Sequence, residues 1–333
     1  MDTIMTKPRI GFLGTGWIGR HRMAAMVASG AVEAVAISDP SAEMLAEALT
    51  AAPGAQPCGS LAEMLALDLD GVVIASPSAL HAAQSITALE AGAAVFCQKP
   101  LGRDAAENEA VVAAARRADR LLGVDLSYRH TAGMRAIAPL VQGGVLGRLF
   151  AIDLTFHNAY GPDKPWFYDR AQSGGGCVMD LGIHLADLAL WLIPGASVVG
   201  VDAALYAGGA PVAREAVEDY AVANIRLDHG VTVRLACSWR LHAGQDAVIE
   251  AAFYGTEGGA ALRNVSGSFY DFTAEHFRGT ARETLAVPPD DWGGRAAVDW
   301  ARRLAAGARF DPAADDYVAT ARVLDAIYAA GRG

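Results

Sequence analysis

Two patterns of apolar and polar residues divide the chain. In the first third, short apolar runs rich in Val and Ile alternate with longer Ala- and Leu-rich segments in which apolar residues recur at helical spacing. Such runs are typical of buried strands, and their alternation with helices predicts right-handed βαβ units and a mostly parallel sheet with helices on both faces. The predicted strands are RIGFL (9–13), VEAVAIS (32–38), GVVIAS (71–76), AAVFC (93–97) and LLGVDL (121–126).

Apolar and polar residues alternate one by one in most of the remaining chain, with turn signals between the segments. This pattern predicts an α+β domain built on a large, mostly antiparallel open sheet. Helical spacing returns in DLGIHLADLALWL (180–192) and in DYVATARVLDAIYAA (316–330). The predicted strands lie within RLFAIDLTFHNA (148–159), SVVGVDAALY (197–206), YAVANIRLD (220–228), GVTVRLACSWRL (230–241) and DAVIEAAFYG (246–255).

The change of pattern places a domain boundary after residue 125, and 333 residues are enough for two domains. Residues 1–125 form the predicted α/β domain. Residues 126–333 form the predicted α+β domain for substrate binding and oligomerisation, and its C-terminal helix can pack back on the first domain. Ser60 and Asp104 each stand three residues before a glutamate, which is the spacing of a capping box at a helix start.

The segment GTGWIG follows the first predicted strand and opens a helical segment, which is the context of a dinucleotide-binding turn. The first glycine would form the tight turn, the second would let the backbone approach a pyrophosphate, and the third would let the helix pack against the strand. The N–H groups at the helix start would bind the phosphates. The expected cofactor-binding residues are Gly14, Gly16, Trp17, Ile18 and Gly19.

Asp39 is a second, independent sign of dinucleotide binding. It follows the second predicted strand, 20 residues after Gly19, where an acidic residue bonds the adenosine ribose hydroxyls. A carboxylate there also repels the 2′-phosphate of NADP, and no arginine occurs at 40–45. The sequence therefore predicts a Rossmann domain that binds NAD, with NADP as the weaker alternative.

A lysine follows the fifth predicted strand, in the segment CQKPLG, residues 97–102. Open α/β sheets bind ligands beyond the carboxyl ends of their strands, so Lys99 is expected to face the cofactor. Its amine can hydrogen-bond a substrate hydroxyl and stabilise oxyanion character as hydride leaves. A solvated surface lysine is the alternative, but Pro100 restricts the backbone beside Lys99 and gives that side chain a defined direction.

A carboxylate and an imidazole share the apolar segment SGGGCVMDLGIHLADLALWL. In an α-helix, Asp180 and His184 would lie on one face near the helix start, and the glycines before them would let the backbone pass close to a ligand. Such a pair suits acid–base chemistry, because imidazole titrates near neutral pH. Two alternatives are a satisfied pair in the core and a metal site with Asp187, which no further His/Cys cluster supports.

Three motifs in this order resemble those of the Gfo/Idh/MocA family of oxidoreductases: GTGWIG, VVIASPSALHAAQSITALEAGAAVFCQKPLG and SGGGCVMDLGIHLADLALWL. The resemblance extends over essentially the whole chain. It implies an N-terminal Rossmann domain and a C-terminal α/β domain whose open sheet often forms the face of a homodimer or homotetramer. It also implies oxidation or reduction of a secondary alcohol or anomeric carbon on a sugar, cyclitol or related polyol.

The resemblance implies roles for single residues as well. Lys99 matches the lysine of the family's EKP segment, and Asp180 and His184 match its DxGxH pair, which together form the catalytic set in inositol-dehydrogenase-like members. His184 is then the expected proton acceptor, Lys99 would bind the reacting oxygen, and Asp180 would orient the substrate hydroxyls or the imidazole. Residues expected near the nicotinamide half of the cofactor are Ser76, Pro77, His81, Gln98 and Lys99.

Two positions depart from the family pattern. Gln98 replaces the usual glutamate of the EKP segment, and Ser78 stands where asparagine is common. A carboxylate beside Lys99 would stabilise its ammonium form, and the neutral amide of Gln98 removes that effect.

Several polar and aromatic residues are candidates for a sugar pocket. Tyr128 and Arg129 come just after the last strand of the first domain, and Tyr160 and Trp166 lie in the loop NAYGPDKPWFYD. Aromatic rings offer large apolar faces with specific geometry, which suits stacking on a sugar ring. Packing within the protein is an equally good interpretation for each of these residues.

Composition argues against several other classes. The formal net charge is −10 and no basic stripe is present, so a nucleic-acid surface is not expected. We find no apolar run of the roughly 18 residues that a membrane span needs, and the start MDTIMTKPRI lacks the apolar stretch of a secretory signal. Four scattered cysteines without a CxxC pair favour a reduced, cytoplasmic protein over a disulfide framework or a zinc site.

Three function classes follow from these observations. The favoured one is an NAD-dependent sugar or polyol dehydrogenase that acts on CH–OH groups. A glycosidase that uses tightly held NAD for transient oxidation is the second. A non-catalytic dinucleotide-binding sensor is the third, and it would be expected to have lost Lys99, Asp180 or His184, all of which are present.

Overall fold

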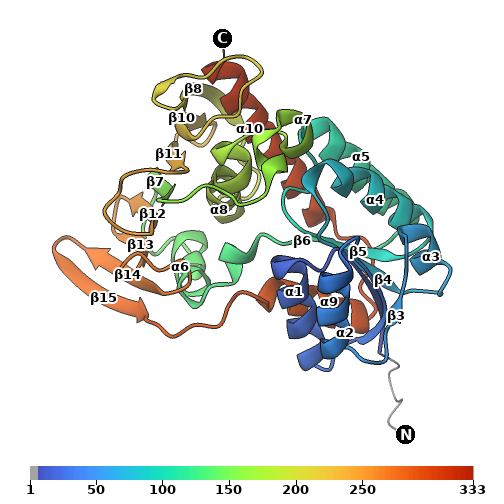
Figure 1. Cartoon of the computed structure of the whole chain (residues 1–333). Helices are drawn as coiled ribbons and strands as arrows, with labels where there is room; N and C mark the ends of the chain where they lie inside the picture. Colours follow the sequence, from blue (N-terminus) through green and yellow to red (C-terminus); the bar gives the residue numbers. More distant parts are fainter. Residues whose placement is uncertain (1–6, 333) are drawn as a thin grey trace, which may run out of the picture. The chain divides into compact units, whose positions relative to one another are not determined.

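The computed structural model describes residues 7–332, which form two compact units (Figure 1). The first unit contains the chain up to Ser127 together with Gly293–Val318. The second contains Tyr128–Trp292 together with the residues after Val318. The sequence predicts one continuous second domain, residues 126–333, and the return of Gly293–Val318 to the first unit differs from that expectation.

The first unit is built on a six-stranded parallel sheet in the order β3-β2-β1-β4-β5-β6. Helices α1, α2 and α9 cover one face, and α3, α4 and α5 cover the other (Figure 1). The predicted Rossmann-type domain is therefore confirmed, and β3 is the strand that the apolar runs did not indicate. The strands are β1 (Arg9–Leu13), β2 (Glu33–Ser38), β3 (Gln56–Pro57), β4 (Gly71–Ile74), β5 (Ala94–Cys97) and β6 (Leu122–Val124). The helices are α1 (Trp17–Ala28), α2 (Ala42–Ala51), α3 (Leu61–Leu65), α4 (Ser78–Glu90), α5 (Ala105–Ala118) and α9 (Arg295–Ala305).

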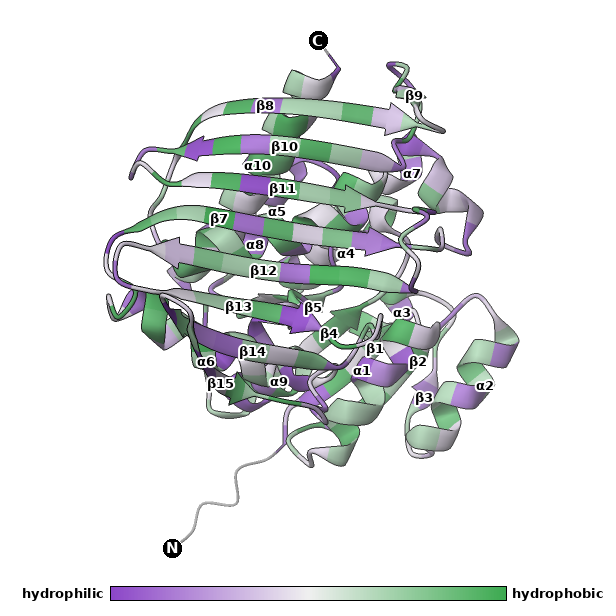
Figure 2. Ribbon diagram, turned by 90° about the vertical axis from the view of Figure 1, so that its left-hand side faces the viewer, coloured by the Kyte–Doolittle hydropathy of each residue, from purple (hydrophilic) through white to green (hydrophobic). Residues whose placement is uncertain are grey.

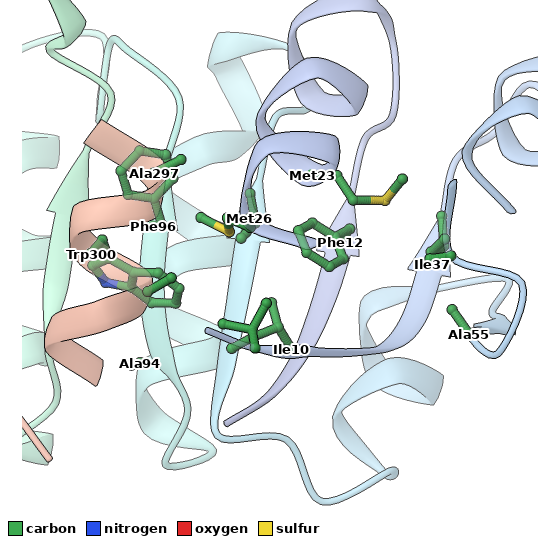
Figure 3. Close-up of a cluster of buried hydrophobic side chains, with 14 of the residues drawn as sticks. Ile10, Phe12, Met23, Met26, Ile37, Ala55, Ala94, Phe96, Ala297 and Trp300 are labelled. Carbon is green, nitrogen blue, oxygen red and sulfur yellow. The ribbon is translucent and has the colours of Figure 1, made fainter. Parts of the chain in front are cut away.

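Trp300 explains why α9 belongs to the first unit. Its indole is 3% exposed and packs with Phe96 of β5 and Ile10 of β1 in the main apolar cluster (Figure 3). A Cβ added at Gly71 or at Gly123 would lie 2.8 or 2.7 Å from an indole atom. The strands β4 and β6 thus carry glycine where the indole crosses them, and burial of this ring fixes α9 on the sheet.

Both predicted capping residues begin helices as expected. The Ser60 hydroxyl accepts a hydrogen bond from the Glu63 N–H at 3.2 Å, and the Asp104 carboxylate accepts from the Glu107 N–H at 2.8 Å. Each bond satisfies one of the N–H groups that a helix start leaves without an intrahelical partner.

The second unit is built on a nine-stranded sheet in the order β15-β14-β13-β12-β7-β11-β10-β8-β9. Neighbours are antiparallel except for β7 and β11, which run parallel, so the predicted mostly antiparallel sheet is confirmed. Helix α8 packs on β7 and β11, and α6 packs on β13 to β15, on the side of the sheet turned away in Figure 2. The strands are β7 (Leu149–Asn158), β8 (Val198–Ala207), β9 (Ala210–Pro211), β10 (Tyr220–Leu227), β11 (Thr232–Ser238), β12 (Ala247–Gly255), β13 (Gly259–Asn264), β14 (Phe272–Arg278) and β15 (Ala281–Ala286).

The helical elements between these strands are mostly short. They are α6 (Ala132–Gln142), α7 (Arg170–Ser173), α8 (Ile183–Leu192) and α10 (Asp315–Gly331), with 3₁₀ turns at Ser127–His130, Pro165–Tyr168 and Pro312–Ala314 and a π-helical turn at Val178–Gly182. Helix α10 begins in the residues of the first unit, and most of it belongs to the second.

One helical stretch, Arg170–Leu192, is long and apolar enough to cross a membrane by composition, with a mean hydropathy of 1.3. The most apolar window of this stretch is 83% buried inside the protein. A buried core helix of a globular protein can have the same length and composition, so the stretch is weak evidence for a membrane span.

Candidate active-site residues

The glycine turn between β1 and α1 has a different geometry at each of its three glycines. Gly14 has a φ of +84°, in the left-handed region that favours glycine, and its N–H donates to the carbonyl of Ser38 at 2.8 Å. A Cβ added at Gly19 would lie 2.1 Å from the carbonyl oxygen of Gly14, so this helix position packs directly on the turn. A Cβ added at Gly16 would meet nothing within 4 Å, which leaves open space above the backbone there.

The start of α1 has the character of an anion site. Gly16 is the N-cap, and a residue without a side chain makes no capping hydrogen bond to the first turn. No acidic side chain occupies that turn, and Trp17 at its start is 57% exposed. The N–H groups and the positive end of the helix dipole thus suit a pyrophosphate group.

Asp39 holds the glycine turn in place. Its Oδ2 accepts from the Thr15 N–H at 2.6 Å, and its Oδ1 accepts from the Ser41 N–H at 2.8 Å. A carboxylate has about four lone-pair sites, so these bonds leave capacity for a ribose hydroxyl. The sequence indicated the ribose role alone, and the structure adds this support of the turn.

Arg20 on α1 forms an ion pair with Glu47 on α2, and its Nη1 lies 3.8 Å from the Met44 sulfur. Thr15 also contacts Met44, since its hydroxyl lies 3.4 Å from the Met44 carbonyl. Arg20 lies outside the segment 40–45, because α1 rather than the chain after Asp39 brings this guanidinium to α2.

His81 links the segment after β4 to the segment after β5. Its Nε2 lies 2.6 Å from the Ser76 carbonyl, and its Nδ1 lies 2.6 Å from the Pro100 carbonyl. Burial lowers the pKa of His81, and the two carbonyl acceptors act in the opposite direction. His81 therefore lies beside Pro100, the residue that follows Lys99. The N–H of Lys99 donates to the Gln98 amide oxygen at 3.1 Å.

Packing explains why glycine precedes Asp180, whereas the sequence pattern predicted that these glycines let the backbone approach a ligand. A Cβ at Gly175 would lie 1.8 Å from the Tyr328 hydroxyl, and one at Gly176 would lie 1.9 Å from the Glu218 carbonyl oxygen. The Glu218 carboxylate, which is 0% exposed, accepts from Gly176 N–H at 2.9 Å, Val178 N–H at 3.0 Å and Tyr328 hydroxyl at 2.8 Å. Close packing inside the second unit therefore requires glycine at both positions.

The helix that carries Asp180 begins with a π-helical turn, Val178–Gly182, and only then continues as α8. The four-residue spacing of Asp180 and His184 predicts a common face in an α-helix, and that argument does not apply to a turn bonded i to i+5. Such turns occur frequently at functional sites.

Asp180 accepts a hydrogen bond from the indole N–H of Trp239, with 3.0 Å between Nε1 and Oδ2. Trp239 directly follows β11 and is 3% exposed, so the donor has a fixed position. Residues of the loop before α7 surround this indole: the rings of Phe167 and Tyr168 meet it edge-on at 6.3 and 5.6 Å. Sequence reasoning missed Trp239, whose only signal was an aromatic residue at the end of a predicted strand.

His184 is 8% exposed and lies in an aromatic cluster of the second unit. Its ring centroid is 4.9 Å from that of Tyr128 and 6.4 Å from that of Phe156. Tyr128 is 8% exposed, and burial raises its pKa strongly. Tyr128, a candidate for the sugar pocket, therefore packs against the imidazole as part of the core.

Arg129 forms an ion pair with Asp187 on α8, with Nε 2.7 Å from Oδ2 and a second bond from Nη2. The Asp187 side chain is 2% exposed and that of Arg129 is 17% exposed. This pairing supports the packing interpretation of Arg129. Within the described range 7–332, no group of three His, Cys, Asp or Glu side chains is placed to hold a metal ion.

The loop aromatics are more accessible. Tyr160 is 58% exposed and its hydroxyl donates to Asp246 at 2.5 Å, while Tyr168 is 39% exposed and lies under the Arg240 guanidinium, 5.0 Å from ring centroid to Cζ. Trp166 stacks on Phe167 at 3.8 Å. These residues belong to the same loop that packs around Trp239, the donor to Asp180.

The parallel sheet, the glycine turn and the acidic residue after β2 define a dinucleotide-binding fold. Residues 8–126 match the model of the oxidoreductase family with an NAD-binding Rossmann fold, and residues 134–261 match that of the GFO/IDH/MocA C-terminal domain. The chain is 33% identical over 279 residues to a putative UDP-kanosamine synthase oxidoreductase subunit of Amycolatopsis mediterranei (strain S699), covering 77% of this chain and 75% of that protein. The chain belongs to the GFO/IDH/MocA family and is an oxidoreductase with an NAD-binding Rossmann domain.

Solved structures share the fold across almost the whole chain. A levoglucosan dehydrogenase in complex with NADH and L-sorbose has a TM-score of 0.84 at 22% identity, with 98% of this chain and 97% of that chain covered. KijD10, a 3-ketoreductase from Actinomadura kijaniata in complex with NADP and TDP-benzene, has a TM-score of 0.82 at 22% identity, with 98% of each chain covered. The two neighbours were solved with different dinucleotides, so the likeness leaves the choice between NAD and NADP open.

Proposed function

We propose that this protein is an NAD-dependent dehydrogenase that transfers a hydride between the nicotinamide and a secondary alcohol or anomeric carbon of a sugar, cyclitol or related polyol. The observation that carries the proposal is the glycine turn, with open space at Gly16 and an uncapped helix start, in a chain that also retains Lys99, Asp180 and His184. The names of its relatives, which include D-glucoside 3-dehydrogenase and inositol 2-dehydrogenase, support this substrate class.

The cofactor proposal is NAD rather than NADP. The glycine turn and the start of α1 would hold the pyrophosphate, and Asp39 would accept from the adenosine ribose. Asp39 disfavours a 2′-phosphate through its charge, and Arg20, the nearby cation on α1, is already paired with Glu47. An Asp39→Ala variant is expected to bind NAD more weakly and to discriminate less against NADP, as measured by the dissociation constants of both.

The bound nicotinamide would accept or supply the hydride. His184 would take the hydroxyl proton during alcohol oxidation, a contribution on the order of 10²–10⁴ in rate. Lys99 would donate to the reacting oxygen and stabilise its negative charge. Asp180, held by Trp239, would accept from neighbouring substrate hydroxyls and fix the orientation of the ring.

The accessible loop aromatics are proposed to contact the substrate. Tyr160 and Trp166 would pack on a sugar ring, and Tyr168 would join them next to Trp239. Tyr128 and Arg129 would support the site from behind, because they contact His184 and Asp187 respectively.

The assembly is proposed to be a homodimer or homotetramer formed through the open face of the nine-stranded sheet, in a reduced, cytoplasmic compartment. No helix of this unit covers the face turned to the viewer in Figure 2. Arginine–carboxylate ion pairs lie along the strands: Arg226 with Asp202, Arg234 with Asp153 and Arg263 with Glu250. Light scattering coupled to size exclusion would report the subunit number, and charge reversal at Arg234 would test the face.

The proposed function is tested by incubating the purified protein with NAD and a panel of sugars, cyclitols and glycosides while the absorbance of NADH is followed. A dehydrogenase produces NADH in proportion to the polyol consumed. A glycosidase would release the aglycone with no net NADH, and a sensor would bind NAD without turning over any compound. Either of the last two results would contradict the proposed dehydrogenase activity.

A further inference from the structure

Asp125 is a buried carboxylate of the first unit that the proposed reaction does not use. The residue directly follows β6 and is 1% exposed. Its N–H donates to the Cys97 carbonyl at the end of β5 at 2.9 Å. Asp125 therefore lies beside the strand end that leads into Lys99.

Two side chains donate to one oxygen of this carboxylate. Arg22 Nε lies 2.6 Å from Asp125 Oδ2, and Gln98 Nε2 lies 2.8 Å from the same atom. The Arg22 and Asp125 side chains are 8% and 0% exposed, so they form a buried ion pair with a neutral amide as the third member. Removing one of the two charges of such a buried pair strongly destabilises the folded protein, because the other charge is left without a partner.

Gln98 connects the ion pair to Lys99. Its amide nitrogen donates to Asp125, and its amide oxygen accepts from the backbone N–H of Lys99 at 3.1 Å. Glutamine can make both bonds because it carries one donor group and one acceptor group. A glutamate would carry acceptors only, and one of its oxygens would face Asp125 Oδ2 at hydrogen-bond distance in a buried site.

We propose that Asp125 is a positioning residue for Lys99, that it acts through Gln98, and that its carboxylate is the reason for glutamine at position 98. The proposal rests on the proposed function, in which Lys99 donates to the reacting oxygen. Asp125 orients the amide of Gln98, and the oriented amide holds the backbone at Lys99. The negative charge that position 98 lacks is supplied by the end of the neighbouring strand, where Arg22 balances it.

A charge swap between positions 98 and 125 tests this arrangement. The wild type has one guanidinium, one carboxylate and one amide; Gln98→Glu adds a second carboxylate, and Asp125→Asn leaves Arg22 without its anion. We expect each single variant to lower the melting temperature by several degrees and kcat by roughly 10- to 100-fold. The double variant Q98E/D125N restores one carboxylate and one amide, and it should recover most of both losses.

Two further measurements separate positioning from stability. Gln56 is exposed on the edge strand β3, so Gln56→Glu adds the same charge away from Asp125 and should change neither quantity. In a Lys99→Ala background, Gln98→Glu should still lower the melting temperature but leave the residual kcat unchanged, because the amine that it positions is already absent.

A double variant no better than the worse single variant would overturn the proposal. An equal loss of kcat with and without Lys99 would also overturn it, because Gln98 would then act by another route. The melting temperatures are measured without substrate. A wild type that turns over no polyol would therefore refute the proposed function. The melting temperatures of the variants would still show whether Asp125 and Gln98 together require one carboxylate and one amide.

Discussion

The Trp239 indole helps to fix the carboxylate of Asp180. The Trp239 N–H donates to it, and the Phe167 and Tyr168 rings hold the indole from the side. A carboxylate that must orient substrate hydroxyls loses part of its effect when it can rotate, because small displacements in an active site cost rate.

Replacing Trp239 with phenylalanine keeps an aromatic ring and removes the donor. We expect kcat to fall roughly 10-fold, or about 1.4 kcal/mol, which is near the lower end for a hydrogen bond to a charged group. Steady-state kinetics in an Asp180→Ala background, which removes the acceptor, should show almost no further loss, because Trp239 acts through Asp180. Trp300→Phe is the matched control: its indole is equally buried, and its Nε1 has no hydrogen-bond partner among the described residues.

Gly176 is required by packing, so its substitution should act on stability. A Cβ there would lie 1.9 Å from the backbone oxygen of Glu218, which also accepts from the Cys177 N–H at 3.1 Å. We expect Gly176→Ala to lower the free energy of unfolding by about 1–3 kcal/mol, as overpacking does elsewhere. Gly54→Ala faces open space, and its denaturation curve should match that of the wild type.

Among the secondary-structure elements, the end of α10 and the segment that carries Asp180 both form hydrogen bonds with Glu218. Tyr328 and Arg332 approach the carboxylate from the C-terminal residues, while the N–H groups of Gly176 and Val178 approach it from the segment that carries Asp180. Burial raises the pKa of Glu218 above its ordinary value of 4.5, although the hydrogen bonds and Arg332 oppose that shift. The carboxyl group therefore binds a proton more tightly in the folded protein than in the unfolded chain.

This linkage predicts how stability depends on pH. The contribution of Glu218 is fully present below the unfolded pKa and is lost as the pH rises through the raised folded pKa. The difference in free energy of unfolding between the wild type and Glu218→Gln should thus shift against the wild type from pH 4.5 upward. Chemical denaturation of both proteins across this range measures it, and a difference that grows in favour of the wild type would contradict the assigned direction.

The strands and helices that the sequence predicted correctly are those with a clear period. The buried runs of the first unit and the alternating segments of β7, β8, β10, β11 and β12 carry that signal in their own residues. The strands β13 and β14 and the helix α9 were not predicted. The two-residue strands β3 and β9 are too short to show a period, and the charged strand β15 (ARETLA) exposes most of its side chains and lacks an apolar face. The π-helical turn was missed because the contacts of Glu218 with the backbone lie outside the local pattern.

For the candidate site too, only the residues that belong to short local motifs could be predicted from the sequence. The motifs indicated the glycine turn and the residues Lys99, Asp180 and His184, because each stands in a short run with characteristic spacing. The side chains that hold them come from distant segments, as Trp239 does for Asp180 and Asp125 does for Gln98. Pairings of this kind depend on how the strands are ordered in the sheets, which spacing along one chain does not encode.

For the molecule as a whole, the proposed function places the cofactor in the first unit and the substrate loop in the second. Lys99 belongs to the first unit, and Asp180 and His184 belong to the second. In the proposed function, Lys99, Asp180 and His184 serve one chemical step. Groups that act on the same step lose their effects together, so their substitutions are far from additive.

The most direct test measures kcat for Lys99→Ala, His184→Ala and the double variant, on the compound that gives the fastest NADH formation with the wild type. We expect each single substitution to lower kcat by roughly 10²- to 10⁴-fold with the NAD dissociation constant nearly unchanged. The double variant should be scarcely slower than the slower single variant. Near-normal turnover in either single variant, or losses that multiply fully in the double variant, would contradict this expectation.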